Sequence, residues 1–161
     1  MESTASQRKQ ILLGLLMTLL LSLLVVVPTV TKGWEDRAHD SALHLYRSIV
    51  FSKVLQEGWW YPRWAPTLNL GLGSPAFTYY SPLTYYAVHI LRWLGRGTVL
   101  AWKLHFALAA VLAALGAWAL TLALTRRVSW ALAGGALYLL APTLLIDLWQ
   151  RGSPQVLVTA L

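Results

Sequence analysis

Three polar side chains at the start of an aromatic stretch could act together in catalysis. Asp40, His44 and Arg47 lie at positions i, i+4 and i+7, so on a helix they project from one face. An acid, an imidazole and a guanidinium on one face suit the transfer of a group to a hydroxyl or an amine. Asp40 is then the general base or a metal ligand, and Arg47 holds a phosphate.

A simpler interpretation of the same residues stays open. Asp40 could cap the helix, His44 could pair with Asp40, and Arg47 could contact lipid headgroups. Zinc binding is disfavoured because one His and one Asp lack the further ligands that zinc needs, although a hydrated divalent cation needs fewer. Asp40 is the only residue that we name as a candidate metal ligand.

The element that positions this trio is an amphipathic helix over residues 42–57, which ends near Gly58. Its apolar residues are spaced to share one face: Leu43, Tyr46, Ile49, Val50 and Val54. This pattern predicts a helix that rests its apolar face on lipid and turns its polar face to a cavity above the bilayer.

Composition places the chain in a membrane. Hydrophobic residues make up 57% of the sequence and charged residues only 12%, about half the charge of a soluble domain. The net charge of +7 is scattered among apolar runs, which argues against nucleic-acid binding and favours anionic lipid. Because the chain has no cysteine, disulfides and thiolate chemistry are excluded.

Hydropathy divides the chain into membrane helices and connections. The run 11–30 follows the basic pair Arg8 and Lys9, which predicts an uncleaved anchor with residues 1–10 in the cytoplasm. We predict the following further segments: a large outer loop at 31–99, transmembrane helices at 100–124 and 130–147, a cytoplasmic turn at 125–129, an outer loop at 148–155, and the start of a truncated helix at 156–161.

A helix over 81–94 decides the topology. Ser81 and Pro82 are typical of a helix start, but fourteen residues reach only about 20 Å at 1.5 Å per residue. We therefore expect this helix to lie on the outer surface, with a spanning helix as the alternative. The fold class is then an all-α, multi-pass membrane protein whose large first outer loop contains interfacial amphipathic helices.

Several motifs in order resemble a known family. They are D-x-x-x-H-L-Y-R, Y-P-R-W-A-P, G-x-G-S-P-x-F-x-Y-Y-S-P-L-x-Y-Y and D-L-W-x-R-G, and they follow a first membrane helix. This pattern resembles the bacterial membrane proteins called pyruvoyl-tetrahydropterin-synthase-related, which look like relatives of the C-type integral membrane glycosyltransferases. The resemblance covers nearly the whole chain from Ile11 onward.

The resemblance implies an enzyme of the bacterial cytoplasmic (inner) membrane that uses polyprenyl-phosphate sugars. Asp40 matches the catalytic acid of the first periplasmic loop. His44 and Arg47 match further catalytic positions of that loop. Substrate-binding positions are matched by Tyr61, Arg63, Trp64, Tyr80, Asp147 and Arg151.

Members of that superfamily are much longer, so a chain of this length is not expected to complete a transfer alone. The alternative function is a non-catalytic accessory subunit of a larger respiratory or photosynthetic membrane complex, in contact with lipid or pigment. The small residues at 131–136 could then pack against a partner helix. A tetrapyrrole bound through His89 or His105 is disfavoured, because neither histidine lies in a recognisable partner motif.

Overall fold

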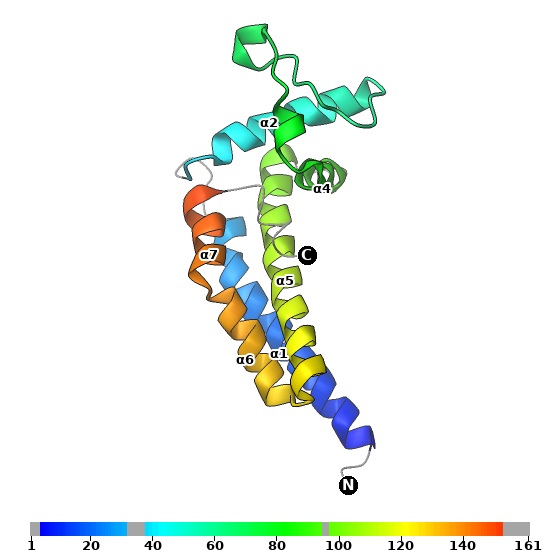
Figure 1. Ribbon diagram of the computed structural model, residues 1–161, viewed down its shortest axis with the longest axis vertical. Coiled ribbons are helices and arrows are strands. Elements are labelled where there is room, and N and C mark those ends of the chain that lie inside the picture. Colours follow the sequence, from blue (N-terminus) through cyan, green and yellow to red (C-terminus); the bar gives the residue numbers. More distant parts are fainter. Residues whose placement is uncertain (1–3, 32–37, 95–96, 153–161) are drawn as a thin grey trace.

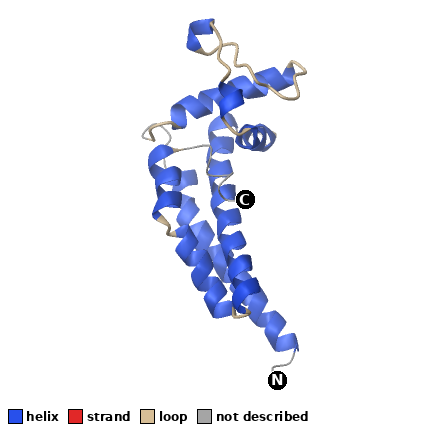
Figure 2. Ribbon diagram, in the orientation of Figure 1, coloured by secondary structure: helices blue, strands red, loops and turns tan. Residues whose placement is uncertain are grey.

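The computed structural model describes residues 4–31, 38–94 and 97–152, and this part of the chain is mostly helical with no strand (Figures 1 and 2). The longer helices are α1 (Thr4–Thr31), α2 (Ser41–Gln56), α4 (Pro82–Arg92), α5 (Gly97–Thr125) and α6 (Val128–Leu139). The short elements are the 3-10 turn η1 (Asn69–Gly71), α3 (Ala76–Tyr79), α7 (Pro142–Leu145) and the π-helical turn η2 (Ile146–Arg151).

Three helices, α1, α5 and α6, pack together along the long axis of the molecule (Figure 1). Two segments are long and apolar enough to cross a membrane. These are Ala5–Thr31 and Gly97–Thr125, with mean hydropathies of 2.8 and 2.2. A third span is formed if Val128–Leu139 and Pro142–Arg151, which meet at a bend of 42°, count as one. The predicted helices at 11–30 and 100–124 lie within α1 and α5.

The packing face of α1 carries small hydroxyl side chains instead of its leucines. Thr18, Ser22 and Thr29 are buried, and their hydroxyls donate to backbone carbonyls of the same helix at 2.6–3.0 Å. Leu24, in contrast, is 74% exposed. Small residues let helix backbones approach closely, and leucine gains little from a protein neighbour when the surroundings are lipid. This distribution is the one expected of a helix in hydrocarbon.

The small residues at 131–136 face the inside of the bundle. Gly135 is buried, and a Cβ at this position would lie 3.2 Å from the Ala114 carbonyl oxygen and 3.2 Å from Thr18 Cγ2. A Cβ at Gly134 would lie 2.3 Å from Thr121 Oγ1. These glycines therefore allow α6 to approach α1 and α5, whereas Ala133 and Ala136 of the same stretch are only half-buried.

The predicted single helix at 130–147 is wrong in one respect, because the chain breaks before Pro142. Ala141 has an extended ψ of 129°, as the residue before a proline prefers, and Pro142 starts α7. The predicted loop at 148–155 is also wrong in its first part, because η2 continues to Arg151. Gly152, at φ 61° in the left-handed region, ends this turn.

Two helices lie across the end of the bundle that is opposite to the N-terminus. In Figure 1, α2 crosses the top of α5, and α4 is viewed nearly end-on while α5 runs vertically. Both contact α5, and α2 also contacts α4. The helices predicted at 42–57 and 81–94 are thus observed at Ser41–Gln56 and Pro82–Arg92, and α4 does not run alongside the long helices.

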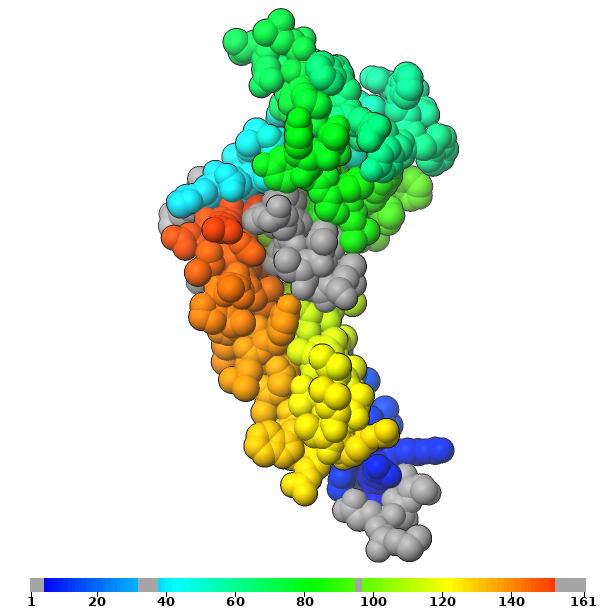
Figure 3. Space-filling view, viewed as in Figure 1, coloured from blue at the N-terminus to red at the C-terminus, as the bar shows by residue number. Residues whose placement is uncertain are grey.

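The segment from α2 to α4 forms a head that is wider than the bundle beneath it (Figure 3). Its core consists of Val50, Phe51, Val54, Ala65, Leu68, Ala76, Phe77 and Tyr85. The turn predicted at 125–129 is shorter and consists of Arg126 and Arg127 between α5 and α6. The start of the helix predicted at 156–161, and residues 32–37 and 95–96 of the predicted loop at 31–99, lie outside the described residues.

Candidate functional site

Helix α2 turns a polar stripe toward the protein, contrary to the expected orientation. Ser41, His44 and Ser48 are buried, whereas Leu43 and Tyr46 are 45% and 43% exposed. Of the apolar residues that predicted the lipid-facing side, Leu43 and Tyr46 are exposed, whereas Val50 and Val54 are buried in the core of the head. The pattern therefore marks the buried side only in the second half of α2. A hydrophobic pattern cannot distinguish these orientations where one side of a helix meets protein and the other can meet lipid, because both surroundings accept apolar groups.

His44 is the centre of a buried polar cluster. Its Nδ1 lies 3.0 Å from the Tyr85 hydroxyl and 3.5 Å from Arg47 Nη1. A guanidinium can only donate, so this geometry assigns an acceptor Nδ1, and the ring proton is on Nε2. The Tyr80 ring makes an edge contact with His44 at 4.8 Å between centroids, and the Arg47 guanidinium lies over the same ring at 4.7 Å.

Burial and the charge of Arg47 lower the pKa of His44 to about 4, against an opposing effect of Asp40. The imidazole is therefore neutral at pH 7 and takes up a proton only as the pH falls toward 4. Burial also raises the pKa of the Tyr85 phenol, so this group stays protonated and donates to His44. In this cluster the Tyr85 hydroxyl is the donor, His44 Nδ1 is the acceptor, and the Arg47 guanidinium is a fixed positive charge.

The lowered pKa makes stability depend on pH. Unfolding restores an ordinary pKa of 6.5 to His44, so the unfolded chain binds more protons between pH 6.5 and 4, and stability is lost as the pH falls through this window. The lowering from 6.5 to about 4 corresponds to roughly 3 kcal/mol. We expect the melting temperature in detergent to fall over this window, and we expect His44→Gln to flatten the dependence.

His39→Gln is the matched control for this measurement, because His39 precedes the same helix and is exposed. This variant should keep the pH dependence of the wild type. A His44→Gln variant with an unchanged dependence between pH 6.5 and 4 would contradict the proposed burial of a neutral imidazole.

Trp102 of α5 anchors the first turn of α2. Its indole N–H donates to Ser41 Oγ at 2.8 Å, and its ring is stacked with His44 at 6.4 Å. On the same helix, His105 Nδ1 donates to the Trp102 carbonyl, and His105 Nε2 is buried without a hydrogen-bond partner among the described residues. The bundle thus fixes both the start of α2 and the plane of the His44 ring.

Asp40 lies outside this buried cluster. Its side chain is exposed and makes no capping hydrogen bond with α2, and His44 bonds to Tyr85 and Arg47 instead of to Asp40. The simpler interpretation, in which Asp40 caps the helix and pairs with His44, is therefore wrong on both points. The carboxylate faces solvent at the start of the helix.

Backbone hydrogen bonds join Asp40 to the end of η2. The N–H groups of His39 and Asp40 donate to the carbonyls of Gln150 and Arg151 at 3.1 and 3.0 Å. Within η2, Arg151 Nη1 lies 3.4 Å from Asp147 Oδ1. The fold thus brings Arg151 beside Asp40, although more than a hundred residues separate them in the sequence, and Asp147 is linked to this point through its ion pair with Arg151.

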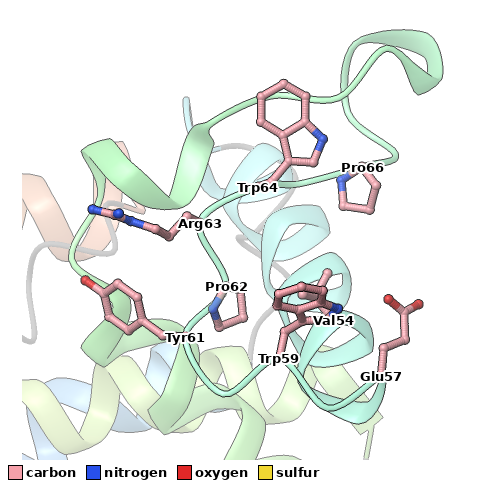
Figure 4. A pocket seen from close by; sticks show the side chains of 8 residues that line it. All are labelled: Val54, Glu57, Trp59, Tyr61, Pro62, Arg63, Trp64 and Pro66. Carbon is pink, nitrogen blue, oxygen red and sulfur yellow. The ribbon is translucent and has the colours of Figure 1, made fainter.

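The predicted substrate-binding residues divide between the two ends of α2. Tyr80 joins His44 and Arg47, and Asp147 and Arg151 join Asp40. The remaining three, Tyr61, Arg63 and Trp64, line a cavity beside the last turn of α2 (Figure 4). The sequence did not indicate that these three residues lie far from Asp40. The motif Y-P-R-W-A-P contains no signal for the direction in which the chain leaves α2.

The other predicted ligand sites gain no further ligands. Within residues 4–31, 38–94 and 97–152, no three His, Cys, Asp or Glu side chains gather to hold a metal ion, so Asp40 has no such companions there. His89 makes an edge contact with Trp93, and His105 is buried within α5.

Two residues of the site were missed by sequence reasoning. Tyr85 was assigned no role, and Trp102 lies in an apolar run that gives no sign of a polar role. Both donate hydrogen bonds to α2 from other helices, and such contacts have no local sequence signal.

Comparison with protein-family models, curated proteins and solved structures returned no match for this chain.

Proposed function

We propose that this chain is a C-type glycosyltransferase-like integral membrane protein that uses a polyprenyl-phosphate sugar, and that its residues form the N-terminal part of that architecture. The observation that carries the proposal is the pairing of Asp40 with the carbonyl of Arg151. The motif resemblance assigns these residues to two separate outer loops of one catalytic site, and the fold joins these two segments.

The proposed topology is a multi-pass arrangement in the bacterial cytoplasmic membrane. The N-terminal turns of α1 and the Arg126–Arg127 turn line one cavity at the same end of the bundle, and the positive-inside tendency places this end in the cytoplasm. Asp40, Glu57 and Asp147 belong to the opposite end, which faces outward. Helices α2 and α4 then lie along the outer surface of the membrane.

In the proposed reaction, Asp40 is the general base. An acceptor hydroxyl attacks the anomeric carbon of the sugar and loses its proton to the Asp40 carboxylate. The bond between that carbon and the phosphate oxygen breaks, and polyprenyl phosphate leaves with the electron pair. A base in this role contributes about 10²–10⁴-fold to the rate.

Arg47 is suited to hold the phosphate. It lies two helical turns beyond Asp40, which is about 10 Å along the axis. Among the described residues no carboxylate forms an ion pair with it, and its buried Nε has no hydrogen-bond partner. His44 and the Tyr80 ring fix the position of its guanidinium, so its charge is available to a phosphate oxygen.

Replacing Asp40 by Asn tests the proposal. We expect a loss of about 10²–10⁴-fold in transfer from radiolabelled polyprenyl-phosphate mannose or arabinose to the acceptors of isolated membranes. Membrane insertion and melting temperature should stay unchanged, because the side chain is exposed and makes no cap. His39→Gln is the control and should retain transfer. Undiminished transfer by the Asp40→Asn variant would end the assignment.

The accessory-subunit alternative stays a prediction. Of the small residues at 131–136 that could have met a partner helix, Gly134 and Gly135 lie against α5 and α1 of the same chain, so these two do not support it. Contacts with membrane lipid and with other membrane subunits remain compatible with the glycosyltransferase proposal.

A further inference from the structure

A cavity of about 440 Å³ lies beside the last turn of α2, in the head of the molecule (Figure 4). Its lining consists of Val54, Glu57, Trp59, Tyr61, Pro62, Arg63, Trp64 and Pro66. The volume lies within the range of about 300–1,000 Å³ that is typical of small-molecule sites, and the lining combines aromatic rings with few polar groups, as such sites do.

The aromatic rings of this cavity are exposed to solvent. Trp59 is 68% exposed, Tyr61 60% and Trp64 53%. Clustered exposed aromatic surface indicates a binding surface. Because the head lies beyond the end of the bundle (Figure 1), hydrocarbon around α1 and α5 does not explain the exposure.

The position of Trp64 is fixed by Gly73. A Cβ on Gly73 would lie 2.5 Å from both Nε1 and Cζ2 of the Trp64 indole, so the ring rests directly on the glycine backbone. Gly73 has a φ of +80°, which suits glycine alone. Paired backbone hydrogen bonds of 2.7 and 3.0 Å between Ala65 and Ser74 close this turn. The G-L-G-S-P motif therefore builds a support for the indole.

Hydrogen bonds from two helices hold the rest of the cavity wall. The Tyr86 hydroxyl of α4 donates to the Trp60 carbonyl, and the Tyr46 hydroxyl of α2 donates to Thr67 Oγ1 at 3.1 Å. Between these points the chain carries Tyr61 and Trp64, and Trp59 directly precedes the first point. The wall is thus preorganised, which reduces the entropy that a ligand must overcome on binding.

The charges of the cavity select against an ionic ligand. Glu57 and Arg63 have opposite signs, so neither an anion nor a cation is favoured by net charge. The guanidinium of Arg63 lies 5.9 Å from the centre of the Tyr61 ring, so a protein cation already uses this aromatic face. What remains is a set of apolar ring faces with one carboxylate acceptor and one guanidinium donor.

We propose that this cavity binds a pyranose ring, with its C–H face on the indoles and its hydroxyls bonded to Glu57. A pyranose combines an apolar face with a neutral, hydroxyl-rich edge, which is the chemistry that the lining presents. The site is distinct from that of Asp40, because the 16 residues of α2 separate Asp40 from Glu57, which is about 25 Å along the helix axis. It is a binding site for carbohydrate outside the reacting centre.

Saturation-transfer NMR on the protein in lipid nanodiscs tests this proposal. The probes are methyl β-glucoside and methyl α-mannoside, and choline and inorganic phosphate serve as ionic alternatives. We expect a signal from at least one glycoside, and at least tenfold weaker binding in a Trp59→Ala, Trp64→Ala double variant. Trp60→Ala is the matched control, because Trp60 is 85% exposed and does not line the cavity.

A second variant distinguishes a change in the cavity from general unfolding of the protein. Gly73→Ala should displace the Trp64 indole and weaken glycoside binding while the circular dichroism of the helices is retained. The proposal is overturned if no glycoside binds, if the double variant binds like the wild type, or if only choline or phosphate binds. Asp40→Asn should keep glycoside binding, so the result here does not depend on whether the transfer reaction is correct.

Discussion

Replacing Trp102 by Ala is expected to lower the free energy of unfolding by about 3–5 kcal/mol. The ring is fully buried and contacts His44, His105 and Phe106. Its removal leaves a cavity where α2 joins the bundle. The same change removes the donor to the Ser41 hydroxyl, so α2 loses an attachment to α5. Detergent-solubilised protein unfolded with SDS and followed by circular dichroism gives the measurement.

Two further variants separate packing from hydrogen bonding. Trp102→Phe keeps most of the ring but removes the N–H, and should cost about 1–3 kcal/mol. Trp130→Ala removes an indole that is 57% exposed, and should change stability by less than about 0.5 kcal/mol. If Trp102→Ala is as stable as Trp130→Ala, the anchoring of α2 by Trp102 is wrong.

Replacing Gly135 by Leu is the second change with a large expected effect. A Cβ there already meets the Ala114 carbonyl oxygen at 3.2 Å, Thr18 Cγ2 at 3.2 Å and Trp118 Cβ at 3.4 Å. The further carbons of leucine have no space, so α6 must move away from α1 and α5. Overpacking of this kind costs about 1–3 kcal/mol or more. The SDS unfolding midpoint should fall accordingly.

Gly116→Leu is the matched control, with the opposite expected sign. Gly116 lies in the middle of α5, and nothing lies within 4 Å of a Cβ at this position. Glycine is about 1 kcal/mol less favourable than alanine in a helix interior, so leucine should be neutral or slightly stabilising. Equal losses for Gly135→Leu and Gly116→Leu would show that close helix contact at Gly135 does not matter.

The positions of the helices could be predicted because their signals are local. Long apolar runs indicated α1 and α5, since a chain in hydrocarbon must pair its own backbone groups within a helix. Ser81 and Pro82 indicated the start of α4. The break at Pro142 within the run 130–147 was not predicted, because hydropathy does not respond to a missing N–H or to a bend.

The arrangement of the candidate site could be predicted only in part. Spacing grouped Asp40, His44 and Arg47, but the fold leaves Asp40 in solvent and buries His44 against Tyr85. Rotation of α2 about its axis decides this, and the hydrophobic pattern did not indicate that the stripe of Ser41, His44 and Ser48 is buried. Small serines allow close packing on α5, and the Trp102 and Tyr85 donors satisfy the polar stripe.

By itself, the sequence determined that the chain has helices suited to a membrane and an aromatic, polar segment between them. Composition and backbone hydrogen bonding are sufficient for that result. Only the tertiary structure decided that Asp40 meets Arg151 at one end of α2, and that Trp59 and Trp64 frame a cavity at the other. The first of these contacts joins residues that are distant in the chain, and the second depends on how α2 is rotated about its axis. Tertiary packing, and no local sequence signal, determines both.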